Sequence, residues 1–339
     1  METFLLVAVT LATCAFALLN GFRDAANSVA TSVRTRALGP RVAVVTAAVF
    51  TFGGTMMSTR FSEALVDAAD FHYTSTVDGL AVLLVAVLTG GAWLLWCYAR
   101  GIPTSSGHAL FAALAGALLG HAFLNPGEPR SVPLILLFGL AVPILVTPLV
   151  AFALSYAITI PAMWIMRHTS SNDAARTGRA AQAIASCAVA LGNGLQDGQR
   201  NAAFLTLAFV MVGSTTADAD VPLWIQLLCA ACMGLGALGG GWRIAHTISN
   251  RLVRFDPVRG ASAQLVAASL LYVGAQVLHL PLSTTQAVTS AIVGSGASQR
   301  FETVLWANMG RVMRFWALGP VVCCGVGIVL MLAVHPLVA

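Results

Sequence analysis

The chain has 339 residues, of which 58% are hydrophobic and 9% are charged, and its mean hydropathy is +0.83. Soluble domains carry about 25% charged residues, so this composition excludes an ordinary soluble protein and predicts an all-α polytopic membrane protein. All 18 basic residues are arginine. Without lysine the chain has neither a Walker A lysine nor a Schiff-base lysine, and we do not expect an enzyme. We also expect no cofactor, no metal site and no nucleic-acid partner.

Six apolar stretches approach or exceed the roughly 20 residues that cross a bilayer. They cover residues 3–19, 42–59, 80–99, 132–166, 221–242 and 316–334. Each is expected to be a helix, because a helix satisfies its backbone hydrogen bonds inside lipid without a closed barrel. The first stretch lacks a basic region before it and is expected to stay as a span. The sequence therefore predicts a multi-pass protein of the cell inner (plasma) membrane, in contact with lipid.

A polar motif interrupts the first apolar stretch and recurs in the second half. Its copies are Asn-Gly-Phe-Arg-Asp-Ala-Ala-Asn at 20–27 and Asn-Gly-Leu-Gln-Asp-Gly-Gln-Arg at 193–200. The Asn-Gly pair at 20–21 predicts a helix end, and Asp24 predicts the cap of a new half-helix. An aspartate at membrane depth costs about 3 kcal/mol, so Asp24 and Asp197 are candidate cation or proton sites, with a structural hydrogen-bond anchor as the alternative.

A second motif is also duplicated, as Pro-Thr-Ser-Ser-Gly-His at 103–108 and Pro-Leu-Ser-Thr-Thr-Gln at 281–286. Each copy follows an apolar limb and predicts a helix start with proline in its first turn, so that two re-entrant helical hairpins form. A helix start offers unpaired N–H groups and a positive dipole end, which together bind an oxyanion. We therefore expect one anion between the two starts. Singly, each hydroxyl is as consistent with helix packing as with ligand binding.

The polar loops predict that the two halves cross the membrane in opposite directions. Basic residues follow the first motif and acidic residues follow the second, and one loop later the order is reversed. The loops after the two motifs carry Arg34, Arg36 and Arg41 in the first half and Asp218 and Asp220 in the second. The next loops carry Glu63, Asp67, Asp70 and Asp78 in the first half and Arg243, Arg251, Arg254 and Arg259 in the second. We expect two inverted-topology repeats with broken helices, at 1–166 and 183–339, joined by a cytoplasmic linker at 167–182.

Two carboxylates beside an oxyanion repel it by about 4 kcal/mol each at ~4 Å and an effective dielectric near 20. A proton or cation must offset this repulsion, and the two ligands are then thermodynamically linked. The motifs therefore predict symport. An intramembrane hydrolase that uses both aspartates and a passive anion channel remain the alternatives from other classes.

Together the four motifs resemble the inorganic phosphate transporter (PiT) family, over nearly the whole chain. The resemblance implies a homodimeric secondary phosphate symporter with alternating access. The variants present are most similar to the bacterial low-affinity branch, which is coupled to H⁺ and carries phosphate partly as a neutral complex with a metal such as Mg²⁺. Other members use Na⁺, and some carry sulfate, which keeps both alternatives open.

The resemblance also assigns site residues. Asp24, Asp197, Asn201 and Gln196 are expected to bind the coupling cation or proton, and the phosphate-binding set is expected to be Ser105, Ser106, Ser283, Thr284, Thr285, Asn27 and Arg200. Three positions depart from the family pattern. Gly107 removes a hydroxyl, Gln286 replaces a histidine, and Gln196 replaces an asparagine. Arg200 is also expected to pair with Asp197, Arg23 to extend toward the membrane surface, and the glycines at 234–241 to pack helices.

Overall fold

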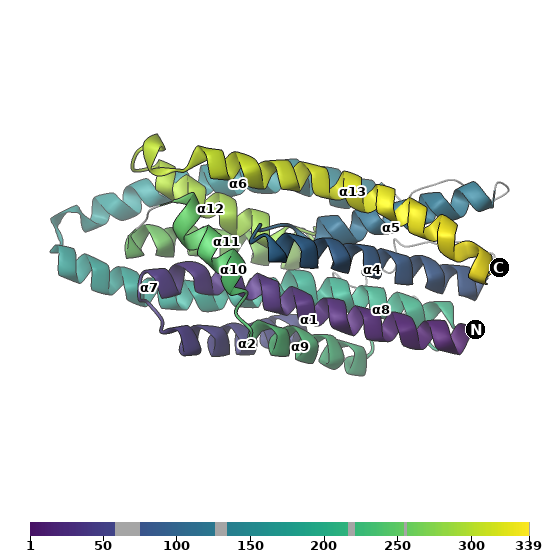
Figure 1. Cartoon of the computed structure of the whole chain (residues 1–339). Helices are drawn as coiled ribbons and strands as arrows, with labels where there is room; N and C mark the ends of the chain where they lie inside the picture. Colours follow the sequence, from purple (N-terminus) through teal and green to yellow (C-terminus); the bar gives the residue numbers. More distant parts are fainter. Residues whose placement is uncertain (58–74, 126–133, 216–220, 254–255, 339) are drawn as a thin grey trace.

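The computed structural model describes residues 1–57, 75–125, 134–215, 221–253 and 256–338 (Figure 1). Regular structure in this described part is helical, apart from one isolated bridge between Val253 and Val304. The predicted loop residues Glu63, Asp67, Asp70, Asp218, Asp220 and Arg254 lie outside these ranges. Within these described ranges, five helices are long and apolar enough to cross a membrane, and a bent pair makes a sixth candidate. The chain is a multi-pass helical membrane protein.

The first half contains α1 (Glu2–Arg34), α2 (Pro40–Met56), α4 (Thr76–Ala99), α5 (Ser106–Leu124), α6 (Leu134–Ile165) and η1 (Met166–His168). The second half contains α7 (Ser171–Asn193), η2 (Gly194–Gly198), α8 (Gln199–Met211), α9 (Leu223–Ala237), α10 (Trp242–His246), η3 (Thr247–Leu252), α11 (Pro257–Gln276), α12 (Thr284–Ala297), η4 (Phe301–Thr303) and α13 (Trp306–Val338). The expected linker at 167–182 is therefore occupied mainly by the first turns of α7.

Helices of the first half pack against helices of the second half. Helix α13 packs on α5, while α6 packs on α12; helix α1 packs on α9, while α7 packs on α2. Helix α1 runs away from the end of the bundle that carries both termini, and α7 and α8 run back toward it (Figure 1). This reciprocal, antiparallel arrangement is what the expected inverted repeats would produce. The repeat boundaries themselves stay a prediction.

Two helical hairpins are present where the sequence predicts them. Helices α4 and α5 are separated by residues 100–105, and α11 and α12 by residues 277–283. Ser105 caps α5 by accepting the His108 N–H at 3.3 Å, and Ser283 caps α12 by accepting the Gln286 N–H at 3.2 Å. The expectation that each proline stands in the first turn is wrong. A capping serine lies outside its helix, so both helices begin after the serine and the prolines precede the cap.

The predicted helix end in the first motif is also wrong, because α1 continues without interruption from Glu2 to Arg34. Gly21 serves close packing instead: a Cβ there would lie 1.9 Å from the carbonyl oxygen of Met233 in α9. Gly194 has the same role in the second half, where a Cβ would lie 2.1 Å from the carbonyl oxygen of Thr51. The second motif departs from α-helical geometry only in the π-helical turn η2.

The glycine-rich stretch after α9 has two structural roles. Gly236 confirms the expected helix packing, since a Cβ there would lie 2.0 Å from the carbonyl oxygen of Leu18. Gly240 and Gly241 have positive φ angles of 71° and 53°, which favour glycine, and the chain bends there by 55° between α9 and the α10–η3 segment. After the bend, α10 runs across the bundle (Figure 1).

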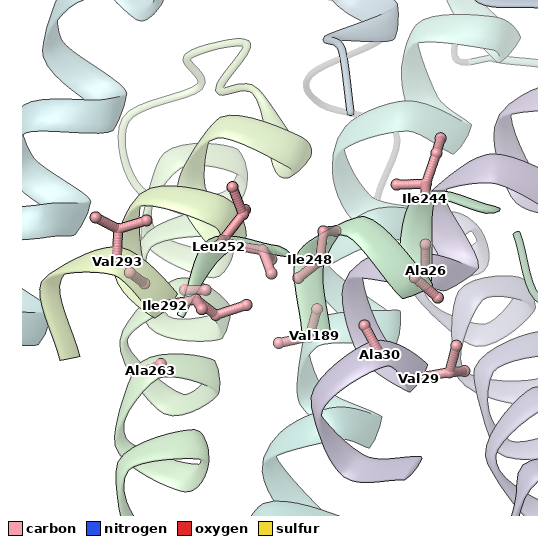
Figure 2. Packing of buried hydrophobic residues seen from close by; sticks show 14 of the residues in the cluster. Ala26, Val29, Ala30, Val189, Ile244, Ile248, Leu252, Ala263, Ile292 and Val293 are labelled. Atoms are coloured by element: carbon pink, nitrogen blue, oxygen red, sulfur yellow. The ribbon is translucent and has the colours of Figure 1, made fainter. Parts of the chain in front are cut away.

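Among the described residues the buried apolar side chains form three clusters, and α1 contributes to the two larger ones. Figure 2 shows part of the first, with Ala26 and Val29 from α1, Val189 from α7, and further residues from α10, η3, α11 and α12. The second cluster takes Leu5 and Phe16 from the other end of α1, together with residues of α4, α5, α8 and α13. Because α1 enters both clusters, the stretch between them, with Asp24, lies deep in the bundle.

Candidate functional site

Asp197 joins the two helix starts. Its Oδ1 accepts a hydrogen bond from Ser106 at the start of α5 at 2.8 Å, and its Oδ2 accepts one from Thr284 at the start of α12 at 3.0 Å. Arg200, one turn along the same helix, forms the predicted ion pair with Oδ1. The Asp197 side chain is buried. One carboxylate therefore connects both hairpins through charge-assisted hydrogen bonds.

Asp24 is buried at the same place but has fewer partners. Thr285 donates to its Oδ1 at 3.3 Å. Its Oδ2 is buried and has no hydrogen-bond partner among the described residues, and no ion pair with Asp24 occurs there. Because Thr284 and Thr285 are consecutive, the two aspartates lie against the same turn of α12. The structure thus brings together carboxylates that are 173 residues apart in the sequence (197 − 24).

The sequence predicted that Arg23 extends toward the membrane surface, but the structure buries it. Its side chain is 1% exposed, and its Nη2 donates to the carbonyl oxygen of Thr104 at 2.8 Å and to the Thr104 hydroxyl at 3.2 Å. Backbone carbonyls in a buried loop need donors, and the guanidinium supplies one. Arg23 therefore holds the loop between α4 and α5.

Gln196 has the corresponding role in the second half. Its Nε2 donates to the carbonyl oxygens of Leu271 and Leu280 at 3.2 and 3.3 Å, and its Oε1 accepts the Leu282 N–H at 3.1 Å. Both ends of the amide are thus engaged with the second hairpin. The residue before each aspartate binds the hairpin loop of its own half. Both residues stand directly before an aspartate of the duplicated motif. This shared position could have predicted their role, but the sequence interpretation treated each residue singly.

Replacement of Gln196 by alanine is expected to loosen the loop between α11 and α12. Loss of a buried hydrogen bond costs about 1 kcal/mol, which corresponds to roughly fivefold faster opening. Hydrogen exchange of the backbone amides of residues 278–280 and 282, measured by mass spectrometry, should increase accordingly. Gln226→Ala is the matched control, since Gln226 donates at 3.1 Å to Thr55 of α2 instead. Equal protection of the loop in both variants would contradict this role for Gln196.

The remaining predicted residues divide into two groups. Ser105 and Ser283 serve as helix caps, and Asn201 lies on the side of α1 and α9, where it approaches Asn20 and Met233 at 3.5 Å each. By contrast, Nδ2 of Asn27 is buried and has no partner among the described residues. The same holds for both ring nitrogens of His108 and for the side-chain amide of Gln286, at equivalent positions of α5 and α12. Such groups are available to a ligand. The ligand roles of all the predicted residues stay predictions.

Comparison with known proteins agrees with this geometry. The Phosphate transporter family pattern matches residues 20–327. A probable low-affinity inorganic phosphate transporter of Bacillus subtilis (strain 168) is 34% identical over 324 residues, 94% of each chain. One of Rhizobium meliloti (strain 1021), given the same description, is 31% identical, over 93% of this chain and 92% of the relative. A solved structure described as the sodium-dependent phosphate transporter shares the fold, with a TM-score of 0.81 at 19% identity over 98% of this chain and 99% of that one. The chain is a transporter rather than an enzyme, and it belongs to the phosphate transporter family.

Proposed function

We propose that this protein imports inorganic phosphate by symport, driven by H⁺, with the anion held between the starts of α5 and α12. One observation carries the proposal. Hydroxyls at both helix starts, on Ser106, Thr284 and Thr285, converge on two buried carboxylates. The starts supply N–H groups and positive dipole ends, and Arg200 adds a full positive charge beside them.

Coupling follows from the state of Asp24. A buried carboxylate oxygen without a donor is unfavourable unless a proton or a cation binds it. Phosphate beside the empty, charged site would be repelled, so phosphate binding and cation binding favour each other. The relatives are described as low-affinity transporters, and the resemblance to the bacterial low-affinity branch implies H⁺, whereas the structurally similar transporter is described as sodium-dependent.

Phosphate fits this site better than sulfate. Phosphate carries at least one proton near neutral pH and can donate a hydrogen bond to a carboxylate, whereas sulfate carries none. The guanidinium of Arg200 occupies the space of a side chain at Gly107 and replaces the donor that a hydroxyl there would supply.

The test is phosphate uptake by purified protein in liposomes. Inward gradients of H⁺ and of Na⁺ are imposed separately, each with and without Mg²⁺, and excess sulfate is added in a further arm. We expect phosphate to accumulate with the H⁺ gradient, with little competition from sulfate, and uptake that rises with Mg²⁺ would support transport of a metal–phosphate complex. Uptake that never exceeds the outside concentration would favour a channel, and no uptake under either gradient would reject the proposal.

A further inference from the structure

The two copies of the aspartate motif differ in charge. When they are aligned on Asp24 and Asp197, Asn27 and Arg200 occupy equivalent positions. When the hairpins are aligned on their capping serines, Thr285 and Gly107 occupy equivalent positions. The first-half aspartate is therefore accompanied by an amide and a hydroxyl. The second-half aspartate is accompanied by a guanidinium and a residue without a side chain.

The arginine and the glycine fit each other in space. A Cβ on residue 107 would lie 1.7 Å from Nη1 of Arg200 and 2.9 Å from its Cζ, so the guanidinium fills the volume that a side chain at 107 would need. At the first-half aspartate, the Thr285 hydroxyl of α12 donates to Oδ1 of Asp24. In the second half, Nη2 of Arg200 donates to Oδ1 of Asp197. The guanidinium thus takes the place of the hydroxyl.

This substitution makes the two carboxylates unequal. Asp197 has three side-chain donors, one of which carries a fixed positive charge, because an arginine keeps its proton in proteins. Asp24 has one donor, and its Oδ2 lacks a partner within the described ranges. A mobile cation at Asp197 would lie beside the guanidinium and be repelled by it, whereas at Asp24 it would meet an unpaired carboxylate.

We infer that Asp24 alone binds the exchangeable coupling cation, and that Arg200, admitted by Gly107, is a tethered cation that permanently fills the equivalent place at Asp197. The inference rests on the proposed symport function and adds to it the number of cations: one for each phosphate. It also gives Gly107 a purpose, since any side chain there would displace the arginine.

The first measurement needs no variant. The phosphate accumulation ratio at steady state is recorded as the imposed gradient of H⁺, or of Na⁺, is varied at constant membrane potential and constant internal pH or pNa. The slope of its logarithm against the logarithm of the gradient counts the cations that accompany each phosphate. A slope of one is expected for the wild-type protein. A slope of two overturns the inference while leaving symport intact, whereas an absence of uptake rejects the proposed function itself.

Two double variants test the residues. Arg200→Asn combined with Gly107→Thr copies the first-half pattern into the second half and should create a second cation site. The slope should rise by one, so that a roughly tenfold cation gradient supports about tenfold more accumulation than in the wild type. Asp197→Asn combined with Arg200→Gln removes the ion pair without changing the net charge. It should keep the wild-type slope, although the rate falls.

Controls separate these outcomes from general damage. Arg167→Asn removes an exposed arginine of η1 and should leave the slope unchanged. Each variant is first checked for a monodisperse profile in detergent, and if neither double variant passes, the wild-type slope decides. A slope reduced by one in Asp197→Asn with Arg200→Gln, or an unchanged slope in a folded Arg200→Asn with Gly107→Thr, would mean that Asp197 is itself an exchangeable site.

Discussion

Asp24→Asn is expected to abolish phosphate accumulation against a gradient while phosphate exchange across the membrane continues. Asparagine keeps the shape of the side chain, and its oxygen can still accept the hydrogen bond from Thr285. It is neutral whether or not a cation is present, so the link between cation and phosphate disappears. That link is worth about 4 kcal/mol for charges ~4 Å apart, or roughly a thousandfold in phosphate affinity between the empty and loaded site.

Two assays on the same liposomes separate the two parts of this result. Net accumulation under an imposed H⁺ or Na⁺ gradient should be lost, whereas exchange of labelled for unlabelled phosphate at equilibrium should persist. Asp173→Asn is the matched control, because Asp173 is an exposed carboxylate in the first turn of α7, where it accepts a hydrogen bond from Ser170 at 2.7 Å. Accumulation close to the wild-type value in Asp24→Asn would contradict the assignment of Asp24 as the coupling site.

The local features of this site could be predicted from the sequence. The duplicated proline and serine motif predicted the two hairpins, although Ser105 and Ser283 act as caps just before each helix, with the prolines outside the first turn. The duplication indicated that Asp24 and Asp197 belong to related units. The short spacing from Asp197 to Arg200 predicted their ion pair, because residues three apart share a helix face.

The features that depend on distant partners could not be predicted. Gly21 was interpreted as a helix end because its contact, the backbone of Met233, is remote in the sequence. Arg23 was expected to reach the surface because nothing near it in the chain indicates that Thr104 lies beside it. Gly107 was interpreted as a lost hydroxyl, although it makes room for Arg200. In each case the role of the residue depends on a contact with a residue that is distant in the sequence.

Gly54→Ala is expected to prevent correct assembly of the two halves, whereas Gly53→Ala, one residue earlier in α2, should be tolerated. A Cβ on residue 54 would lie 2.0 Å from the carbonyl oxygen of Leu191 in α7, and a Cβ on residue 53 would meet nothing within 4 Å. Overpacking against side chains usually costs 1–3 kcal/mol. Here the obstacle is backbone, which cannot rotate away, so we expect a loss of about 3 kcal/mol or more in the free energy of unfolding.

Gly53→Ala is the matched control, because both variants add one methyl group to the same helix and raise its helix propensity by the same amount, about 1 kcal/mol. The thermal midpoint in detergent, followed by fluorescence-detected size exclusion, should fall sharply for Gly54→Ala and stay constant or rise for Gly53→Ala. The close contact of α2 with α7 has a counterpart at Gly21, where α1 meets α9. If both glycine variants proved equally stable, the two halves would not be held together by direct backbone contact, and the site between them would need another explanation for its rigidity.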